Sequence, residues 1–165
     1  MLVPLTRGLY TIVDLDEYER TIQKNWWATP LHKRSKAQYV VRRATKLDGH
    51  IGEDKHIYLH RVILNLADDD PREPDHRNRN GLDNRRSNLR IGTCAQNMAN
   101  RGIFPSNTSG FKGVGRHSGR WRARAYRKGN RIIIGDYNTP EEAARAYDEF
   151  VFKVHGEFAA LNFPR

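Results

Sequence analysis

The last third of the chain contains three short strand patterns followed by one amphipathic helix pattern, and each needs the other to bury its apolar side. The strand patterns occupy 111–116, 119–127 and 130–137, and glycine-containing turns separate them. The helix pattern covers 138–156, with apolar residues recurring every three or four positions along one face. We therefore predict a three-stranded antiparallel sheet packed on one helix.

The ends of this helix are marked in the sequence. Thr139 is a candidate N-cap, and Glu142 stands at the position that closes a capping box. Pro140 takes the first helical position, where its missing N–H costs nothing, and Gly156 follows the last turn. These signals predict that the helix begins after Thr139 and ends at Gly156.

Alternation along strand 119–127 places Trp121, Ala123 and Ala125 on one face of the predicted sheet. The opposite face then presents Arg120, Arg122, Arg124 and Tyr126. Between positions 110 and 135 the chain has eight Lys or Arg and no acid, and we expect the acids on the helix to lie away from this face. A cationic sheet face suits DNA, because strands can enter the major groove and arginine can read guanine edges. The alternative is a solvated face that binds nothing.

Composition points to the same class of partner. The chain of 165 residues has a net charge of +10, mainly from arginine clusters, which favours nucleic-acid binding. The single cysteine, Cys94, excludes a disulfide framework and suits a reducing compartment. No apolar run approaches the roughly 20 residues of a membrane span, and the N-terminus has no signal-peptide pattern. We expect an intracellular, cytoplasmic protein that makes no membrane contact.

A polar, turn-rich segment at 105–109 is predicted to link two domains, 1–104 and 110–165. In the first domain, strands are predicted at 8–13, 26–29, 37–45 and 89–93, with a turn at 46–55. Helices are predicted at 14–23, at 57–66 and from Thr93 onwards, although 57–66 also fits a strand and is assigned to a helix by its length and by the polar stretch that follows it. Capping boxes are predicted for the first of these helices, from Asp14 and Glu17, and for the third, from Thr93 and Gln96.

Four polar residues become neighbours if 74–76 ends one strand and 88–91 begins the next. A helix that starts near Thr93 would then pack across this hairpin, which gathers Asp75, His76, Asn88 and Asn97. Asp and Asn oxygens suit Mg²⁺, a neutral His can take a proton from water, and an Asn carbonyl can orient the ring. Spacing alone leaves other interpretations open, including a structural Asp-His pair among turn formers and a basic loop that contacts phosphate without chemistry.

The run DHRNRNGLDNRRSNLRIGTCAQNMANR resembles an HNH endonuclease motif of the ββα-metal class, most of all the homing-type enzymes of phage and mobile introns. The resemblance covers about 8–101, with the HNH core at about 57–104. It implies that His76 is the general base and that Asp75 and Asn97 hold one divalent metal ion, Mg²⁺ or alternatively Mn²⁺. It also implies that Asn88 braces the loop and orients His76.

Other residues of this run receive simpler interpretations. Asn84 and Asn100 are interpreted as structural, and His60 as a packing or hydrogen-bonding residue. The run departs from the family where an aliphatic and a small residue are usual, because Arg stands at both positions. These two arginines, together with the pair later in the loop, are predicted to contact phosphate: Arg77, Arg79, Arg85 and Arg86.

The C-terminal half resembles the Apetala/ethylene-response-factor DNA-binding domain over about 107–164, through SGFKGVG, WRAR, IIIGDYNTPEEAARAYD and HGEFAALNFP. That domain is a three-stranded sheet with one helix behind it, and it binds the major groove through the sheet. The resemblance places DNA contacts at Lys112, Arg124 and Arg131, with Arg122 and Tyr126 nearby, and we add Arg116 and Arg120 as further cations of the same module. Gly115 and Ile133 depart from the family, which often has Arg and Trp there, so we expect a different target sequence.

Together these patterns predict an α+β protein: a ββα-metal HNH nuclease module followed by a three-stranded antiparallel sheet packed on one helix. The predicted function is metal-dependent cleavage of double-stranded DNA at a recognised site, by a monomer encoded by a phage or mobile element in a bacterial-type host. The alternative is a DNA-binding transcriptional regulator with a vestigial nuclease module. A third interpretation, an RNA-associated basic protein, would need exposed aromatic residues for base stacking, whereas Trp121 is predicted to face the helix.

Overall fold

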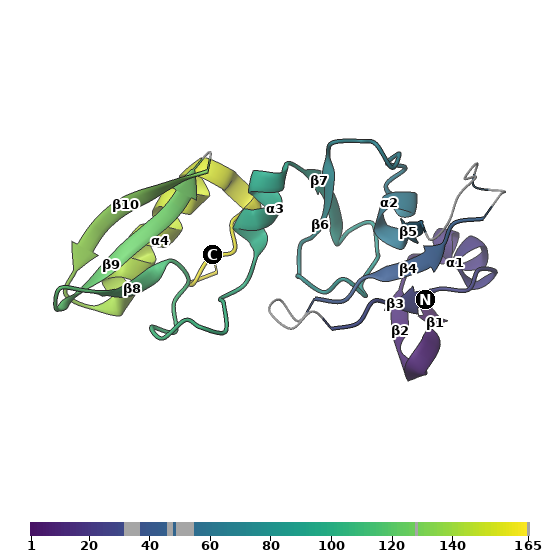
Figure 1. The fold of residues 1–165 in the computed structure, drawn as a ribbon, viewed down its shortest axis with the longest axis horizontal. Coiled ribbons are helices and arrows are strands. Elements are labelled where there is room, and N and C mark those ends of the chain that lie inside the picture. Colours follow the sequence, from purple (N-terminus) through teal and green to yellow (C-terminus); the bar gives the residue numbers. More distant parts are fainter. Residues whose placement is uncertain (32–36, 46–47, 49–54, 128, 165) are drawn as a thin grey trace. The chain divides into compact units, whose positions relative to one another are not determined.

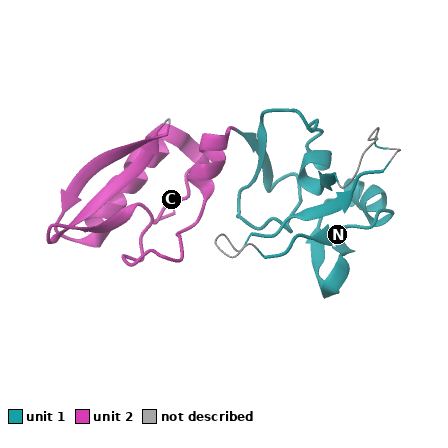
Figure 2. Cartoon of the chain, in the orientation of Figure 1, with its two compact units in different colours: residues 1–92 teal, residues 93–165 magenta. Residues whose placement is uncertain are grey.

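The computed structural model describes residues 1–31, 37–45, 48, 55–127 and 129–164. They form a mixed α/β structure of several small antiparallel sheets, divided into two compact units, 1–92 and 93–165 (Figures 1 and 2). The predicted linker at 105–109 lies inside the second unit. The helix that begins after Thr93 is therefore grouped with the C-terminal sheet. Most of the turn predicted at 46–55 falls on residues 46–47 and 49–54, which lie outside the described residues.

The first unit contains three small sheets, β1–β2, β3–β4–β5 and β6–β7. Its strands are β1 Leu2–Pro4, β2 Tyr10–Ile12, β3 Trp27–Ala28, β4 Val40–Arg43, β5 His56–Tyr58, β6 Glu73–His76 and β7 Leu89–Gly92. Its helices are the 3-10 turn η1 Thr6–Gly8, α1 Leu15–Ile22 and α2 Leu59–Ile63. One apolar core joins side chains from all three sheets and from α2, including Val3, Trp26, Val40, Leu59 and Leu89. Because Leu89 belongs to this core and pairs with His76, the core fixes the end of the β6–β7 hairpin from which residues 77–88 depart.

Two local predictions for this unit are wrong. The segment 57–66 was predicted to be one helix, but its first residues continue β5, which pairs with β4 through Arg42↔Ile57, and only Leu59–Ile63 are helical. The edge of β4 needs a partner, and that pairing overrides the local helical pattern. Asp14 makes no side-chain cap on α1; its carboxylate accepts a hydrogen bond from the backbone N–H of Arg86 at 2.7 Å instead.

The second unit has the predicted sheet and helix. Its elements are α3 Cys94–Asn100, β8 Val114–His117, β9 Arg120–Arg127, β10 Asn130–Tyr137, α4 Pro140–His155 and the 3-10 turn η3 Gly156–Phe158. The strands are antiparallel in the order β10–β9–β8, and α4 packs against all three. Ala123 and Ala125 of β9 are buried against Ala143 and Ala144 of α4, so small side chains allow the helix to lie close to the sheet.

The predicted helix ends of this unit are confirmed. Thr139 and Glu142 form a reciprocal capping box on α4, and Thr93 and Gln96 form another on α3. Gly156 follows α4 with a φ of 56°. Local signals of this kind need no long-range partner, which explains why the sequence alone was sufficient here.

The C-terminal tail is held against α4 by one buried carboxylate. Asp148 accepts hydrogen bonds from the backbone N–H groups of Asn162 and Phe163 at 2.9 and 2.8 Å, and from the Asn162 side chain at 3.0 Å. Asn162 in turn bonds both backbone groups of Lys112. The tail therefore closes the unit by tying the end of the chain to the segment that enters β8.

Candidate active site and nucleic-acid interface

The Asp-His pair lies at the end of β6, as predicted, and both side chains are buried. The antiparallel register with β7 places His76 opposite Leu89 and Asp75 opposite Arg90. Between the strands lies the long loop 77–88. The hairpin therefore brings both ends of the Asn- and Arg-rich run to one place in the first unit.

The loop 77–88 packs along β2, which lies about 70 positions earlier in the sequence. The backbone N–H of Ile12 donates to the carbonyl of Leu82 at 2.9 Å, and the N–H of Asn84 donates to the carbonyl of Ile12 at 2.8 Å. Gly81 passes so close to the chain before β4 that an added Cβ would lie 2.0 Å from the carbonyl oxygen of Gln38. Glycine is required at this position because nothing larger than hydrogen fits.

Asn88 braces the loop from inside. Its carbonyl oxygen accepts from the backbone N–H of Asn78 at 3.0 Å, and its amide donates to the Asn78 side chain and to the carbonyl of Asp83. Asp83 also binds Arg85 through two bonds of 2.8 and 2.7 Å, which hold the pKa of the Asp83 carboxyl below its ordinary value. These contacts give the loop one conformation without a regular strand or helix.

The ring of His76 is held by Asn84. Its Nε2 lies 3.3 Å from Oδ1 of Asn84, whereas every contact of Asn88 described above goes to the loop. The orienting contact predicted for Asn88 is thus made by Asn84, a residue that was predicted to be structural. Aromatic rings surround His76 on its other sides: the Tyr39 ring centroid lies 6.0 Å away, and that of His60 lies 5.3 Å away in an edge-on arrangement.

Both histidines of this cluster are neutral near pH 7. Burial is the largest cause that lowers the pKa of His76, and it is opposed by the hydrogen bond to Asn84 and by the charge of Asp75. Burial lowers the pKa of His60 to about 3, and its Nδ1 is a buried nitrogen without a hydrogen-bond partner. A neutral imidazole can accept a proton, so His76 has the protonation state that a general base needs.

Sequence reasoning missed Arg90. Its Nε and Nη2 both lie 2.7 Å from Oδ2 of Asp75, and both side chains are buried. The signal that reveals this pair is the hairpin register: once His76 is set opposite Leu89, Arg90 falls opposite Asp75. The carboxylate predicted to hold a metal is therefore also one partner of a buried ion pair.

The donor set suits a metal site that substrate completes. No group of three or more His, Cys, Asp or Glu side chains within the described ranges could hold an ion by itself. Mg²⁺ commonly takes only one or two protein oxygens and fills its shell with water and substrate phosphate, so a carboxylate with an amide oxygen fits this mode. Asp75 belongs to the first unit and Asn97 to α3 of the second, and their joint role as ligands stays a prediction.

The four loop arginines differ in what they contact. Arg85 binds Asp83, and Arg86 binds Glu17 of α1 at 2.6 Å. Arg77 and Arg79 are exposed, and Arg79 has a positive φ of 63°, a backbone conformation in which small residues are more usual. The two arginines that replace the family's usual residues therefore lie on the surface, where they do not disturb the packing of the loop.

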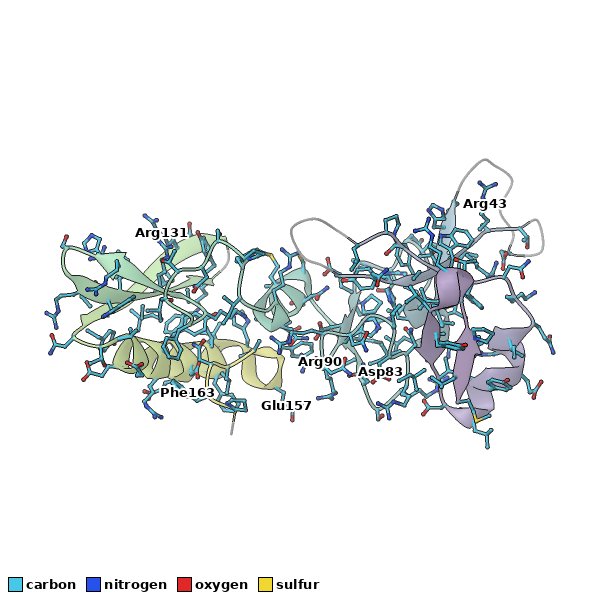
Figure 3. The ribbon with its side chains drawn as sticks, turned by 90° about the horizontal axis from the view of Figure 1, so that it is seen from below. Arg43, Asp83, Arg90, Arg131, Glu157 and Phe163 are labelled. Carbon is cyan, nitrogen blue, oxygen red and sulfur yellow. The ribbon has the colours of Figure 1, made fainter. Side chains whose placement is uncertain are left out.

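The outer face of the C-terminal sheet is cationic, as predicted. Arg124 and Tyr126 of β9 are exposed and pair in register with Ile133 and Arg131 of β10, so these four side chains form one patch. Figure 3 shows Arg131 on the side of the sheet that faces away from α4, whereas Phe163 lies on the helix side.

Other predicted DNA contacts already have partners in the structure. Arg122 forms two bonds of 2.8 and 2.7 Å with Asp136 of β10, so this sheet face includes an acid, contrary to expectation. The guanidinium of Arg116 lies over the Trp121 ring, 4.2 Å from its centroid. The ammonium of Lys112 donates to the carbonyl of Ala99. Arg120 is exposed near the turn between β8 and β9.

Most of the second unit matches a known domain family. Residues 109–157 match the AP2 domain family. An ethylene-responsive transcription factor of Arabidopsis thaliana is 49% identical over 57 residues, which are 33% of this chain and 31% of that protein. An AP2/ERF and B3 domain-containing transcription factor of the same plant is 42% identical over 57 residues, covering 34% and 17% of the two chains. This chain therefore spans less than a third of the length of these plant relatives.

Another relative covers nearly the whole chain. An uncharacterised HNH endonuclease of Acanthamoeba polyphaga mimivirus is 29% identical over 161 residues, which are 94% of this chain and 76% of that protein. No solved structure shows a significant match to the chain. The chain thus resembles an HNH nuclease joined to an AP2-type domain, which confirms the resemblance seen in the sequence motifs.

None of the helices within the described ranges is both long enough and apolar enough to cross a membrane.

Proposed function

We propose that the protein is a metal-dependent DNA endonuclease of the HNH homing type, which hydrolyses a phosphodiester at a recognised duplex site. The supporting observation is the buried Asp75–His76 pair at the end of β6, with the ring of His76 bonded to Asn84. A carboxylate beside a neutral imidazole offers an oxygen ligand and a base at adjacent positions. The mimivirus relative and the AP2 match support the same conclusion.

His76 is the proposed general base. Burial keeps its imidazole neutral, so it can accept a proton from the water that attacks phosphorus. The water oxygen bonds to phosphorus while the bond to the 3′ oxygen breaks, and the departing 3′ oxygen takes a proton from solvent, which leaves a 5′-phosphate and a 3′-hydroxyl. Asn88 contributes indirectly, because the loop that it braces contains the residues that hold the ring.

Asp75 is the proposed ligand for one divalent ion, Mg²⁺ or Mn²⁺, with Asn97 as the proposed second ligand. When bound, the ion stabilises negative charge on the departing 3′ oxygen. Arg90 contacts Oδ2 of Asp75 through two nitrogens, and this contact restrains the carboxylate in one position. The remaining coordination is proposed to come from water and from the phosphate to be cut.

The outer face of the C-terminal sheet is the proposed recognition surface for duplex DNA. Arg124 and Arg131 project from neighbouring strands without an acidic partner among the described residues, so their guanidinium groups are available to guanine edges or phosphates. Ile133, 54% exposed, supplies an apolar contact between them where the family often has a larger ring. Exposed Arg77 and Arg79 of the nuclease loop are proposed to contact phosphate near the cut.

The test is cleavage of supercoiled plasmid that contains a selected target, with Mg²⁺ or with EDTA. The wild-type protein should convert the plasmid to nicked or linear product only with Mg²⁺, and the ends should ligate as 5′-phosphates. His76→Ala should lose about 10²-fold or more in rate, the contribution typical of a general base, while its DNA affinity stays near wild type. Cleavage by His76→Ala at the wild-type rate would exclude His76 as the base.

A second candidate function is regulation of transcription, with a nuclease module that no longer cuts. The observations that favour it are the buried Arg90–Asp75 pair, which engages the proposed metal ligand, and the similarity of the second unit to plant transcription factors. This candidate predicts specific DNA binding without cleavage at any Mg²⁺ or Mn²⁺ concentration. The plasmid experiment separates the two functions, because sequence-specific binding is expected from both and cutting from one alone.

A further inference from the structure

We infer that Thr11 and Asn84 form a positioning relay that holds His76 in one tautomer, with the ring proton on Nε2. Because Thr11 belongs to β2, the N-terminal hairpin β1–β2 helps to position the proposed general base. This inference rests on the proposed function for its catalytic meaning, but its structural claim can be measured without cleavage.

The orientation of the Asn84 amide is fixed by its own contacts. Its nitrogen Nδ2 donates to Oγ1 of Thr11 at 2.9 Å and to the carbonyl oxygen of Gly81 at 3.3 Å. A carbonyl oxygen accepts only, so the amide group facing Gly81 must be the NH₂. The remaining atom, Oδ1, then faces the ring of His76.

The hydroxyl of Thr11 agrees with this assignment. Its single hydrogen is donated to the carbonyl of Leu82 at 2.8 Å. Oγ1 can therefore meet Asn84 only as an acceptor, which again requires the NH₂ group of Asn84 on that side. Two independent acceptors thus impose the same orientation on the amide.

The tautomer of His76 follows from this orientation. Oδ1 of Asn84 has no hydrogen, so Nε2 of His76 must donate in the 3.3 Å contact. In the neutral ring the lone pair then lies on Nδ1, and Nδ1 is the atom that accepts the proton of the attacking water. After the transfer both ring nitrogens are protonated, and Nε2–H still donates to Asn84, so the contact serves the ring before and after the step.

Burial and docking make the relay rigid. Thr11 and Asn84 are both fully buried, and 73 positions separate them in the chain. The backbone bonds between Ile12 and the loop at Leu82 and Asn84 hold the two side chains in register. The rings of Tyr39 and His60 restrict rotation of the His76 ring from its other sides. A change at Thr11 should therefore reach His76 through Asn84.

The experiment compares four variants of the full chain. Asn84→Ala removes the acceptor for Nε2, and Thr11→Val removes the group that orients the amide while keeping the side-chain shape. Thr11→Ser keeps the hydroxyl. Thr21→Val is the matched control, because Thr21 is also a buried threonine of the first unit whose hydroxyl donates to a backbone carbonyl, that of Glu17 at 2.6 Å.

The first measurement is the tautomer of His76, assigned from the nitrogen shifts and couplings of the imidazole in ¹⁵N-histidine-labelled protein at neutral pH, without metal or DNA. Wild type, Thr11→Ser and Thr21→Val should show the proton on Nε2. Thr11→Val should show a mixture of tautomers, and Asn84→Ala should lose the preference for Nε2–H. A wild-type ring protonated on Nδ1 would overturn the relay, whether or not the protein cuts DNA.

The second measurement is the single-turnover rate on plasmid with saturating protein and Mg²⁺. Asn84→Ala should fall by about 10²-fold, within the range that a positioned general base contributes, and Thr11→Val by about tenfold. Thr11→Ser should recover most of the loss, and Thr21→Val should cut like wild type. Loss with His76→Ala but no loss with Asn84→Ala would overturn the relay while leaving the nuclease proposal standing. If Asn84→Ala does not fold, Thr11→Val and the wild-type tautomer still decide the question.

Discussion

The β6–β7 loop and the outer face of the β9–β10 sheet are both rich in arginine, yet they use it in opposite ways. In the loop region Arg85, Arg86 and Arg90 each bind a carboxylate of their own chain. On the sheet Arg124 and Arg131 are exposed, and no acid among the described residues pairs with them. The same residue type stabilises the fold in one region and is available to a partner in the other.

This difference shows that a count of cations does not identify a binding surface. All four loop arginines were predicted to contact phosphate because they cluster, but a cluster that also contains buried acids can be satisfied internally. Asp83, Glu17 and Asp75 are all buried, and a buried polar group is costly unless a cationic or hydrogen-bonding partner satisfies it. The structure therefore divides the cations into those that hold the loop and those that can meet DNA.

Replacing arginine by methionine at one position in each region should separate these roles. Arg90→Met leaves the buried carboxylate of Asp75 without its ion-pair partner, so we expect a loss of about 3–5 kcal/mol in the free energy of unfolding. Urea unfolding measures the free energy of unfolding. Hydrogen exchange of the backbone amides of β6 and β7 then shows whether the hairpin itself is destabilised. The double variant Arg90→Met with Asp75→Leu should recover part of the loss, since no charge is then buried alone. Equal stability of Arg90→Met and wild type would contradict the internal role of the pair.

Acid should destabilise the first unit through His60 of α2, which is buried beside His76. The pKa of His60 is about 3 in the folded protein, below its ordinary value of 6.5, because burial disfavours the charged ring. Between these pH values the unfolded chain binds a proton that the folded chain does not, so stability falls as pH falls. From pH 6.5 to 5 we expect a loss of about 1–2 kcal/mol from this group, because the unfolded histidine is half protonated at the start of that range.

The measurement is the free energy of unfolding as a function of pH for wild type and His60→Gln. The variant should show a shallower decline, with the remainder due in part to His76, whose pKa burial also lowers. His56→Gln is the matched control, because His56 is exposed and lies four positions earlier. Identical slopes for wild type and His60→Gln would show that His60 is not buried as a neutral ring.

The sheet region should respond in the opposite manner. Arg124→Met should change the free energy of unfolding by less than about 0.5 kcal/mol, because the side chain is exposed and makes no ion pair within the described residues. DNA affinity should fall by about 1–3 kcal/mol if the guanidinium reads a guanine edge, and specificity at that base should relax. A binding titration against a set of single-base variants of the selected site tests both. If Arg124→Met lost stability but kept its DNA affinity, Arg124 would serve the fold and not the binding of DNA.

The two regions also differ in how far the sequence predicts them. The sheet and α4 followed from alternation, from helical spacing and from caps such as Thr139 with Glu142, all of which depend on residues a few positions apart. The site was predictable in part: Asp75 and His76 were placed at a strand end, and Asn88 was expected to brace the loop. These assignments depend on the motif and on one hairpin.

What the sequence did not predict depends on contacts between distant positions. The hydrogen bond from Asn84 to Thr11 joins residues 73 positions apart, and the bond from Arg86 to Asp14 joins residues 72 apart. No local pattern distinguishes Asn84 from Asn88 as the partner of His76, because both follow the turn and both have the same chemistry. Only the docking of β2 against the loop decides which one faces the ring.

The smallest expected effect is a change in the salt dependence of DNA binding. It tests whether two arginines of the loop, one paired with an acid and one not, differ in their contact with DNA. Arg79 is exposed and has no ion-pair partner in the described parts of the chain, whereas Arg85 is bound to Asp83. If Arg79 contacts a phosphate, Arg79→Ala should reduce the slope of log affinity against log salt by about 0.9, the value for one released counterion on duplex DNA. Arg85→Ala should change the slope less and cost no more than about 1 kcal/mol of stability, because the Arg85 side chain is half exposed and the buried Asp83 keeps the Asn78 amide as a hydrogen-bond donor. Equal slope changes for the two variants would mean that pairing with Asp83 does not withdraw Arg85 from DNA, and the division of the loop's cations would then fail.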